Sequence, residues 1–180
     1  MKANRTNTMA IVVDIQERIL PAMHNHELLA DKANRLMTGL KLLDVPILIT
    51  QQYTKGLGMS MPFVFEAEGT QEYMDKMAFS AMGDEAIANK VKELDRKNVL
   101  VFGIEAHVCV LQTCLDLKEL GYQPILVLDC ISSRKESDIE MAKLRAIQED
   151  IIVTSYEAIL FELLEKASGD AFKAISKLVR

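Results

Sequence analysis

The residues best able to do chemistry in this sequence are an aspartate, a lysine and a cysteine that lie far apart along the chain. Cys109 follows the apolar run 98–102 and the segment Gly-Ile-Glu-Ala-His-Val, and it opens a helix-like run that extends to residue 120. We expect a cysteine at such a strand-to-helix junction to lie at the positive end of a helix dipole, which lowers the pKa of the thiol and favours the nucleophilic thiolate. Free backbone N–H groups at the same junction could hold an oxyanion.

The other two residues are less informative when each is taken singly. Asp14 directly follows the apolar run 9–13, and Lys76 lies in the segment Met-Asp-Lys-Met-Ala-Phe-Ser. Asp14 could cap the turn after a strand, Lys76 could be a surface lysine, and Cys109 could be a buried small hydrophobe, as we expect of the other two cysteines. None of the three residues therefore carries a functional assignment alone.

The elements that must position these residues alternate along the chain between strands and helices. We predict strands at 9–13, 45–50, 99–103, 124–129 and 151–154, and helices at 27–43, 83–95, 109–120, 137–149, 156–164 and 170–178. A short extended or loop element is expected at 72–79, and a polar loop at 51–61. This alternation predicts an α/β fold in which helices cover both faces of a parallel sheet. Such sheets bind ligands beyond the carboxyl ends of their strands, where Asp14 and the Cys109 loop both fall.

Composition and length narrow the class of protein further. The 180 residues suit one domain, 1–180, in which residues 1–8 are expected to form a flexible N-terminus. A formal net charge of −5 argues against a nucleic-acid partner. No apolar run approaches the roughly 20 residues that cross a membrane, and the polar start lacks a signal-peptide core. Three cysteines cannot all pair, so we expect a reducing, cytoplasmic location.

Three separated segments, in this order, resemble the isochorismatase-like cysteine hydrolases. They are Ile-Val-Val-Asp-Ile-Gln-Glu around Asp14, Met-Asp-Lys-Met-Ala-Phe-Ser around Lys76, and Gly-Ile-Glu-Ala-His-Val-Cys-Val around Cys109. The tract 51–58 and the tail 161–178 are similar to the isochorismatase-domain-containing subgroup of that family. The resemblance implies a three-layer α/β/α Rossmann-like fold with a six-stranded parallel β-sheet, assembled as a homo-oligomer, either a dimer or a tetramer.

The resemblance also implies a role for each residue. Asp14 would be the general base, Lys76 would keep its carboxylate charged, and Cys109 would attack a carbonyl to form an acyl-enzyme. The backbone N–H groups of Glu105 and Cys109 would hold the oxyanion. A non-proline cis peptide bond would join Ile104 to Glu105.

The chain departs from the relatives that hydrolyse nicotinamide, which carry a metal site of one aspartate and two histidines after the second strand. Residues 50–54 read Thr-Gln-Gln-Tyr-Thr, and His24, His26 and His107 lack metal-ligand spacing. We therefore expect no metal and no other cofactor. Relatives that cleave isochorismate lack the cysteine, so Cys109 favours acyl transfer over cleavage of a vinyl ether.

These observations together predict a metal-independent cysteine hydrolase that acts on a small amide-like substrate by cleaving a C–N bond. The candidate pocket residues are Gln16, Gln52, Tyr53, Phe79, Ile104 and His107. The two glutamines could equally make turn and cap hydrogen bonds, and the two aromatic residues could equally be core. The sequence leaves open the identity of the substrate and whether the 51–61 loop closes over the site.

A second reading is a catalytically weak family member that acts as a protein-interaction module, in which the three residues persist but turnover is negligible. Thiol redox chemistry is disfavoured, because Cys109 and Cys114 do not form a Cys-x-x-Cys motif.

Overall fold

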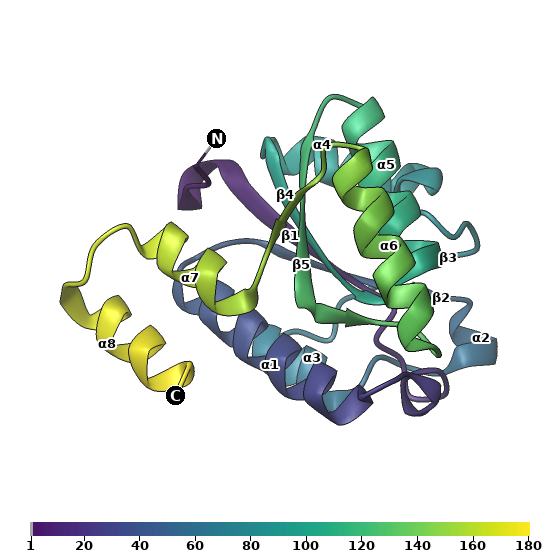
Figure 1. Ribbon diagram of the computed structural model, residues 1–180, viewed down its shortest axis with the longest axis horizontal. Coiled ribbons are helices and arrows are strands. Elements are labelled where there is room, and N and C mark those ends of the chain that lie inside the picture. The colour runs from purple at the N-terminus through teal and green to yellow at the C-terminus, as the bar shows by residue number, and fades with distance from the viewer. Residues whose placement is uncertain (1) are drawn as a thin grey trace.

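Six strands form one sheet in the computed structural model, which describes residues 2–180 (Figure 1). The strands are β1 (Thr8–Val13), β2 (Ile47–Gln52), β3 (Met74–Lys76), β4 (Asn98–Ile104), β5 (Gln123–Ser132) and β6 (Ile152–Thr154). Their spatial order is β3-β2-β1-β4-β5-β6, and every neighbouring pair is parallel. The predicted α/β class with a six-stranded parallel sheet is confirmed.

Helices cover both faces of this sheet. They are α1 (His26–Leu42), α2 (Thr54–Leu57), α3 (Pro62–Glu68), α4 (Glu85–Leu94), α5 (Leu111–Glu119), α6 (Glu136–Gln148), α7 (Tyr156–Leu164) and α8 (Gly169–Leu178). Helices α1, α3 and α7 lie on one face with α8 beside them, and α4, α5 and α6 lie on the other (Figure 1). The result is the three-layer α/β/α arrangement that the sequence predicts.

The burial pattern explains why these segments form these elements. Every residue of β1 and β4 is buried, as expected of central strands that helices cover on both faces. In α1 the residues at positions 29, 33, 36, 37 and 40 are buried, which is the spacing of one helical face. These strands and this helix face form a continuous apolar core.

Four segments differ from the sequence-based expectation. The 51–61 segment is not simply a loop, because β2 runs through Gln52 and α2 follows it. Helix α3 forms where the sequence predicts no helix, whereas the edge strand β3 agrees with the short extended or loop element expected at 72–79. The predicted helix 109–120 starts earlier, as a π-helical turn over Ala106–Val110 that leads into α5. The fourth difference lies at the N-terminus.

Part of the N-terminal segment that the sequence predicts to be flexible is packed. Ala3 is buried and donates its backbone N–H to the Glu162 carboxylate, and Arg5–Asn7 form a 3-10 turn before β1. Met1, which belongs to the same predicted segment, lies outside the described residues. None of the helices within residues 2–180 has the length and apolar character needed to cross a bilayer.

The strand order reverses beside β1, and this reversal places the site. β1 lies between β2 and β4, with Val13 opposite Thr50 on one side and Gly103 on the other. The carboxyl ends of the three strands therefore lie at one level, at the topological switch point where open α/β sheets bind ligands. Gly103 has φ of +123°, and a Cβ there would lie 2.1 Å from the Val13 carbonyl oxygen, so only glycine fits this junction.

Candidate active site

Asp14 is the first residue after β1, and its carboxylate is buried at the switch point. Its φ of +53° is left-handed, a conformation that aspartate tolerates better than most residues. The Thr50 hydroxyl donates to Oδ1 at 2.8 Å. Only 1% of the residue is exposed, and this burial raises the pKa of Asp14 despite the opposing effects of Lys76 and Thr50. A buried carboxylate with a raised pKa is a stronger proton acceptor than an ordinary aspartate.

Lys76, at the end of β3, is also buried, with 1% of the residue exposed. Its ammonium lies 2.7 Å from Asp14 Oδ2 and donates to Gln52 Oε1 at 2.7 Å. It also donates to the backbone carbonyls of Phe79 at 2.9 Å and Ala78 at 3.2 Å. The alternative of a surface lysine is therefore wrong. The four oxygens surround the ammonium and fix it against the carboxylate.

Cys109 completes the cluster from the π-helical turn after β4, and 7% of the residue is exposed. Its thiol interacts with the Asp14 carboxylate, while Lys76 acts on it more weakly as a cation. Burial first, and the Asp14 charge second, raise the pKa of Cys109 to about 12. The expectation of a lowered thiol pKa is therefore wrong, because desolvation and a neighbouring anion outweigh the helix dipole and the lysine. At neutral pH the thiol is protonated.

Two backbone N–H groups lie beside this sulfur. The Glu105 N–H acts to lower the pKa of the Cys109 thiol, against the larger effect of burial, and the peptide bond between Ile104 and Glu105 is cis. The Glu105 carbonyl accepts from the N–H groups of Val108 and Val110, but from no N–H of Cys109 among residues 2–180. In an α-helical turn the Cys109 N–H would donate to the Glu105 carbonyl, and the π-helical turn does not make this hydrogen bond.

Gln16 and Gln52 have different surroundings, although both were candidate pocket residues. Gln16 is buried, and its amide donates to the carbonyls of Gln52 and Gly58 at 3.1 and 2.7 Å, while its Oε1 accepts from the Gln52 N–H at 2.7 Å. It therefore ties the end of β2 to the segment after α2. The Gln52 side chain instead bridges the Lys76 ammonium and the Met77 carbonyl, so it belongs to the ionic cluster.

The remaining candidates split between rim and core. The Tyr53 and Phe79 side chains are 48% and 56% exposed, so the core alternative is wrong for both. Both are attached to the site through Lys76, whose carbonyl accepts from the Tyr53 N–H at 3.0 Å. Ile104 is fully buried. The His107 ring turns toward the Ser133 hydroxyl, with 2.9 Å between Nδ1 and Oγ.

Sequence reasoning missed Thr50, the residue that binds the second oxygen of Asp14. A signal was present, because Thr50 is a polar residue at the end of an apolar strand, where the side chain can reach the site. Within residues 2–180, no group of three or more histidine, cysteine, aspartate or glutamate side chains is placed to hold a metal ion.

A three-layer α/β/α sheet with a buried cysteine, carboxylate and ammonium at its switch point has the architecture of a hydrolase. The chain belongs to the isochorismatase family: residues 8–158 match the isochorismatase domain. This confirms the resemblance found from the sequence and identifies the fold as that of a family of hydrolases.

Three relatives illustrate the likeness. The chain is 35% identical to "Secreted isochorismatase effector Isc1" of Phytophthora sojae over 97% of its length and 85% of the relative. It is 34% identical to a Caenorhabditis elegans structure described as MAR1 ribonuclease, with a TM-score of 0.92 over 99% of this chain and 92% of that one. The Escherichia coli YcaC gene product, described as an octameric hydrolase of unknown specificity, is 18% identical, with a TM-score of 0.93 over 99% and 90% of the two chains. The last likeness concerns the fold alone.

Proposed function

We propose that this protein is a metal-independent cysteine hydrolase that cleaves the C–N bond of a small amide-like substrate through an acyl-enzyme. One observation carries the proposal. The buried Cys109 thiol, whose pKa burial raises to about 12, interacts with the buried Asp14 carboxylate, and the Lys76 ammonium 2.7 Å from Oδ2 of that carboxylate favours its charged form. Thiol, base and orienting cation are the three parts that activate a nucleophile in this kind of catalysis.

In the first half of the reaction, Asp14 takes the thiol proton while the Cys109 sulfur bonds to the substrate carbonyl carbon. The negative charge that develops on the carbonyl oxygen is stabilised by the N–H groups of Glu105 and Cys109. The tetrahedral intermediate then collapses and breaks the C–N bond. Asp14 returns the proton to the departing nitrogen, which leaves as an amine, and a thioester remains on the enzyme.

Water completes the cycle. Asp14 accepts a proton from a water molecule as the water oxygen attacks the thioester carbonyl. The C–S bond breaks, the proton returns to the sulfur, and a carboxylic acid is released. The positive charge of Lys76, 2.7 Å from Asp14 Oδ2, favours the charged form of Asp14 and so its readiness to accept a proton.

The test is a panel of small primary amides, assayed for ammonia release and for a mass increase on the Cys109 peptide after acid quenching. Cys109→Ala and Asp14→Asn should abolish both signals. Cys114→Ala, a matched control at the buried cysteine five positions along, should keep both. Turnover that persists in Cys109→Ala would refute the proposal for that substrate.

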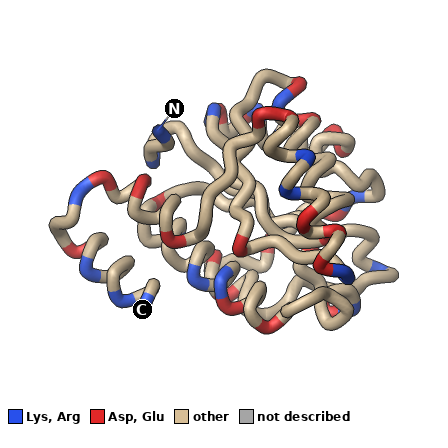
Figure 2. Tube along the Cα trace, viewed as in Figure 1, with Lys and Arg blue, Asp and Glu red and all other residues tan. Residues whose placement is uncertain are grey.

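RNA is the competing substrate, because the C. elegans relative is described as a ribonuclease. The net charge of −5 disfavours it, and basic and acidic residues are interspersed along the trace in Figure 2, with no basic stripe visible in that view. Cleavage of an RNA oligonucleotide that depends on Cys109 would favour this alternative. A catalytically weak interaction module remains the second reading, and the burial of Cys109 is the observation that favours it.

We also propose a homo-oligomer in the cytoplasm. Met141, Leu144 and Ile147 recur at every third position of α6 and are exposed, which is typical of a helix face that another subunit covers. The octameric description of the E. coli neighbour supports assembly in this fold. Sedimentation equilibrium tests the assembly, and a monomeric mass would overturn it.

A further inference from the structure

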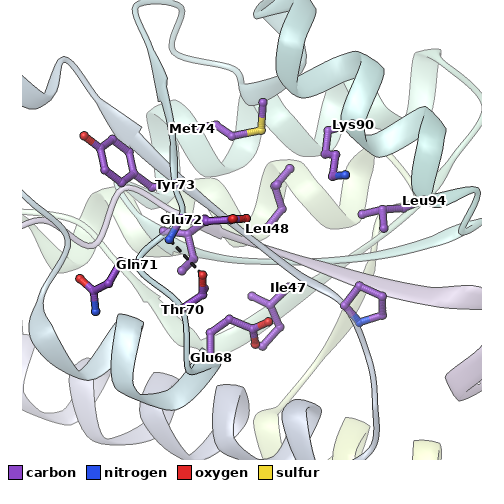
Figure 3. A pocket seen from close by; sticks show the side chains of 12 residues that line it. Ile47, Leu48, Glu68, Thr70, Gln71, Glu72, Tyr73, Met74, Lys90 and Leu94 are labelled. Carbon is purple, nitrogen blue, oxygen red and sulfur yellow. Dashed lines mark hydrogen bonds between the residues drawn. The ribbon is translucent and has the colours of Figure 1, made fainter.

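A cavity of about 590 Å³ lies at the edge of the sheet (Figure 3), and Asp14, Lys76 and Cys109 are not among the residues that line it. Strand β3 pairs with Thr50–Gln52, and no strand within residues 2–180 pairs on that side with the first half of β2, residues 47–49. The walls are the segment 70–74, the end of α3 at Glu68, and α4. The cavity therefore occupies the space that a longer β3 would fill.

The backbone of β2 is open toward this cavity. The N–H groups of Ala10 and Asp14 donate to the carbonyls of Pro46 and Thr50, so the even-numbered residues of β2 direct their backbone groups to β1. The odd-numbered residues face the other side, and no strand among residues 2–180 pairs there with Ile47. An unpaired strand edge offers N–H and C=O groups to an added strand.

Glu68 supplies an unpaired acceptor in the same wall. Its Oε2 is shielded from solvent and has no hydrogen-bond partner among the described residues. Its Oε1 lies 3.5 Å from the ammonium of Lys41, a mostly exposed side chain, and burial raises the pKa of Glu68. In Figure 3 the carboxylate points toward Ile47. Buried polar atoms in folded proteins nearly always have partners, so this one indicates a missing donor.

We propose that this cavity binds a short extended peptide that has a free amino terminus and an apolar side chain. The peptide's amide groups would pair with the open edge at Ile47, and its ammonium would bind the Glu68 carboxylate. Its apolar side chain would contact Leu48, Met74 and Leu94, which line the cavity. A volume of about 590 Å³ suits two to three residues.

Charge complementarity argues for this orientation. Glu72 lines the cavity together with Glu68, so carboxylates from two positions meet the amino terminus. Lys90 on the α4 wall is paired with Glu93 at 3.0 Å, so its charge does not offset these two carboxylates fully. The inference is independent of the proposed hydrolase activity, because it uses no residue of the triad.

The test is an NMR titration of the full chain, labelled with ¹⁵N, with leucyl-leucine amide as the probe. Saturable shifts are expected at the amides of Ile47 and Ile49. Acetylation of the probe's amino group should weaken binding about tenfold or more, because it removes the charge-assisted bond. Glu68→Gln should weaken the free-amino probe to the same extent and leave the acetylated probe unchanged. Glu66→Gln, an exposed carboxylate on the same helix, should behave as the wild type.

Several results would overturn the proposal. These are the absence of saturation at Ile47 up to about 5 mM probe, equal binding of the acetylated probe, or shifts confined to the surroundings of Cys109. Hexylamine bound as tightly as the dipeptide would overturn the pairing with the strand edge. If Glu68→Gln fails to fold, the two probes on the wild-type chain still decide whether the ammonium contributes.

Discussion

Replacing Lys76 by methionine tests the electrostatic core of the site. The ammonium lies 2.7 Å from Asp14 Oδ2, and both groups are buried. At an effective dielectric constant of about 20, Coulomb's law gives an attraction of roughly 6 kcal/mol at this separation. Methionine keeps most of the volume but leaves the Asp14 charge uncompensated. We therefore expect Lys76→Met to lower the free energy of unfolding by about 3–5 kcal/mol at neutral pH.

The loss in the free energy of unfolding of Lys76→Met should depend on pH, and the pKa of Asp14 sets the direction of that dependence. Lys76 lowers the pKa of Asp14, which burial already raises, so its removal raises that pKa further. A carboxyl with a higher pKa in the folded state holds more protons when folded than when unfolded, so stability falls as pH rises above the unfolded value of about 3.9. The deficit of the variant relative to the wild type should be largest at neutral pH and should shrink as Asp14 becomes protonated.

Urea unfolding followed by circular dichroism at several pH values measures this deficit. The double variant Asp14→Asn, Lys76→Met should recover much of the loss, because it buries no unpaired charge. Lys143→Met removes an exposed lysine paired with Glu140 and should change stability by no more than about 0.5 kcal/mol. A deficit that is independent of pH, or near-wild-type stability of Lys76→Met, would refute the assigned electrostatics.

Two further outcomes follow from the geometry. The rate of Cys109 alkylation by iodoacetamide should rise with pH without a plateau below about pH 10. Asp14→Asn should shift this rate–pH curve to lower pH, since the Asp14 charge raises the thiol pKa. Mass spectrometry of the labelled peptides measures both rate–pH curves. The fully buried Cys114 should stay unreactive and serves as the control. A plateau in the Cys109 rate near neutral pH would contradict the raised pKa. Gly103→Ala should destabilise the fold by more than about 3 kcal/mol in urea unfolding, because its Cβ would meet a backbone carbonyl at 2.1 Å. Gly121→Ala, also at positive φ but with open space, should cost only about 1 kcal/mol.

The central layer of the fold could be predicted because the strands are nearly pure apolar runs. β1 and β4 are buried throughout, so hydrophobicity alone marks them. The edge strand β3 has only three residues, and it ends at Lys76, which contacts Asp14. Its length and composition carry too little local signal to decide between the extended and loop alternatives expected at 72–79.

The sequence predicts which residues meet at the candidate site, but it does not predict their pKa values. Residue types and motif order brought Asp14, Lys76 and Cys109 together correctly in space. The pKa of Cys109 could not be inferred, because it depends on the depth of burial and on the distance to the Asp14 charge, neither of which a local pattern contains. The exposure of Tyr53 and Phe79 likewise depends on the direction of loops.

A thiol that is protonated at rest changes what must drive the reaction. In the proposed reaction the sulfur becomes a strong nucleophile only as its proton passes to Asp14, so proton transfer and S–C bond formation would be closely coupled. Lys76 would support this step by favouring the charged form of Asp14, while the burial raises the pKa of Asp14 and makes it a better base. We expect such a site to respond weakly to a freely diffusing electrophile and strongly to a carbonyl whose oxygen already lies at the proposed oxyanion donors, the Glu105 and Cys109 N–H groups. Selectivity for substrate would then come from placement at these donors rather than from the intrinsic reactivity of the thiol.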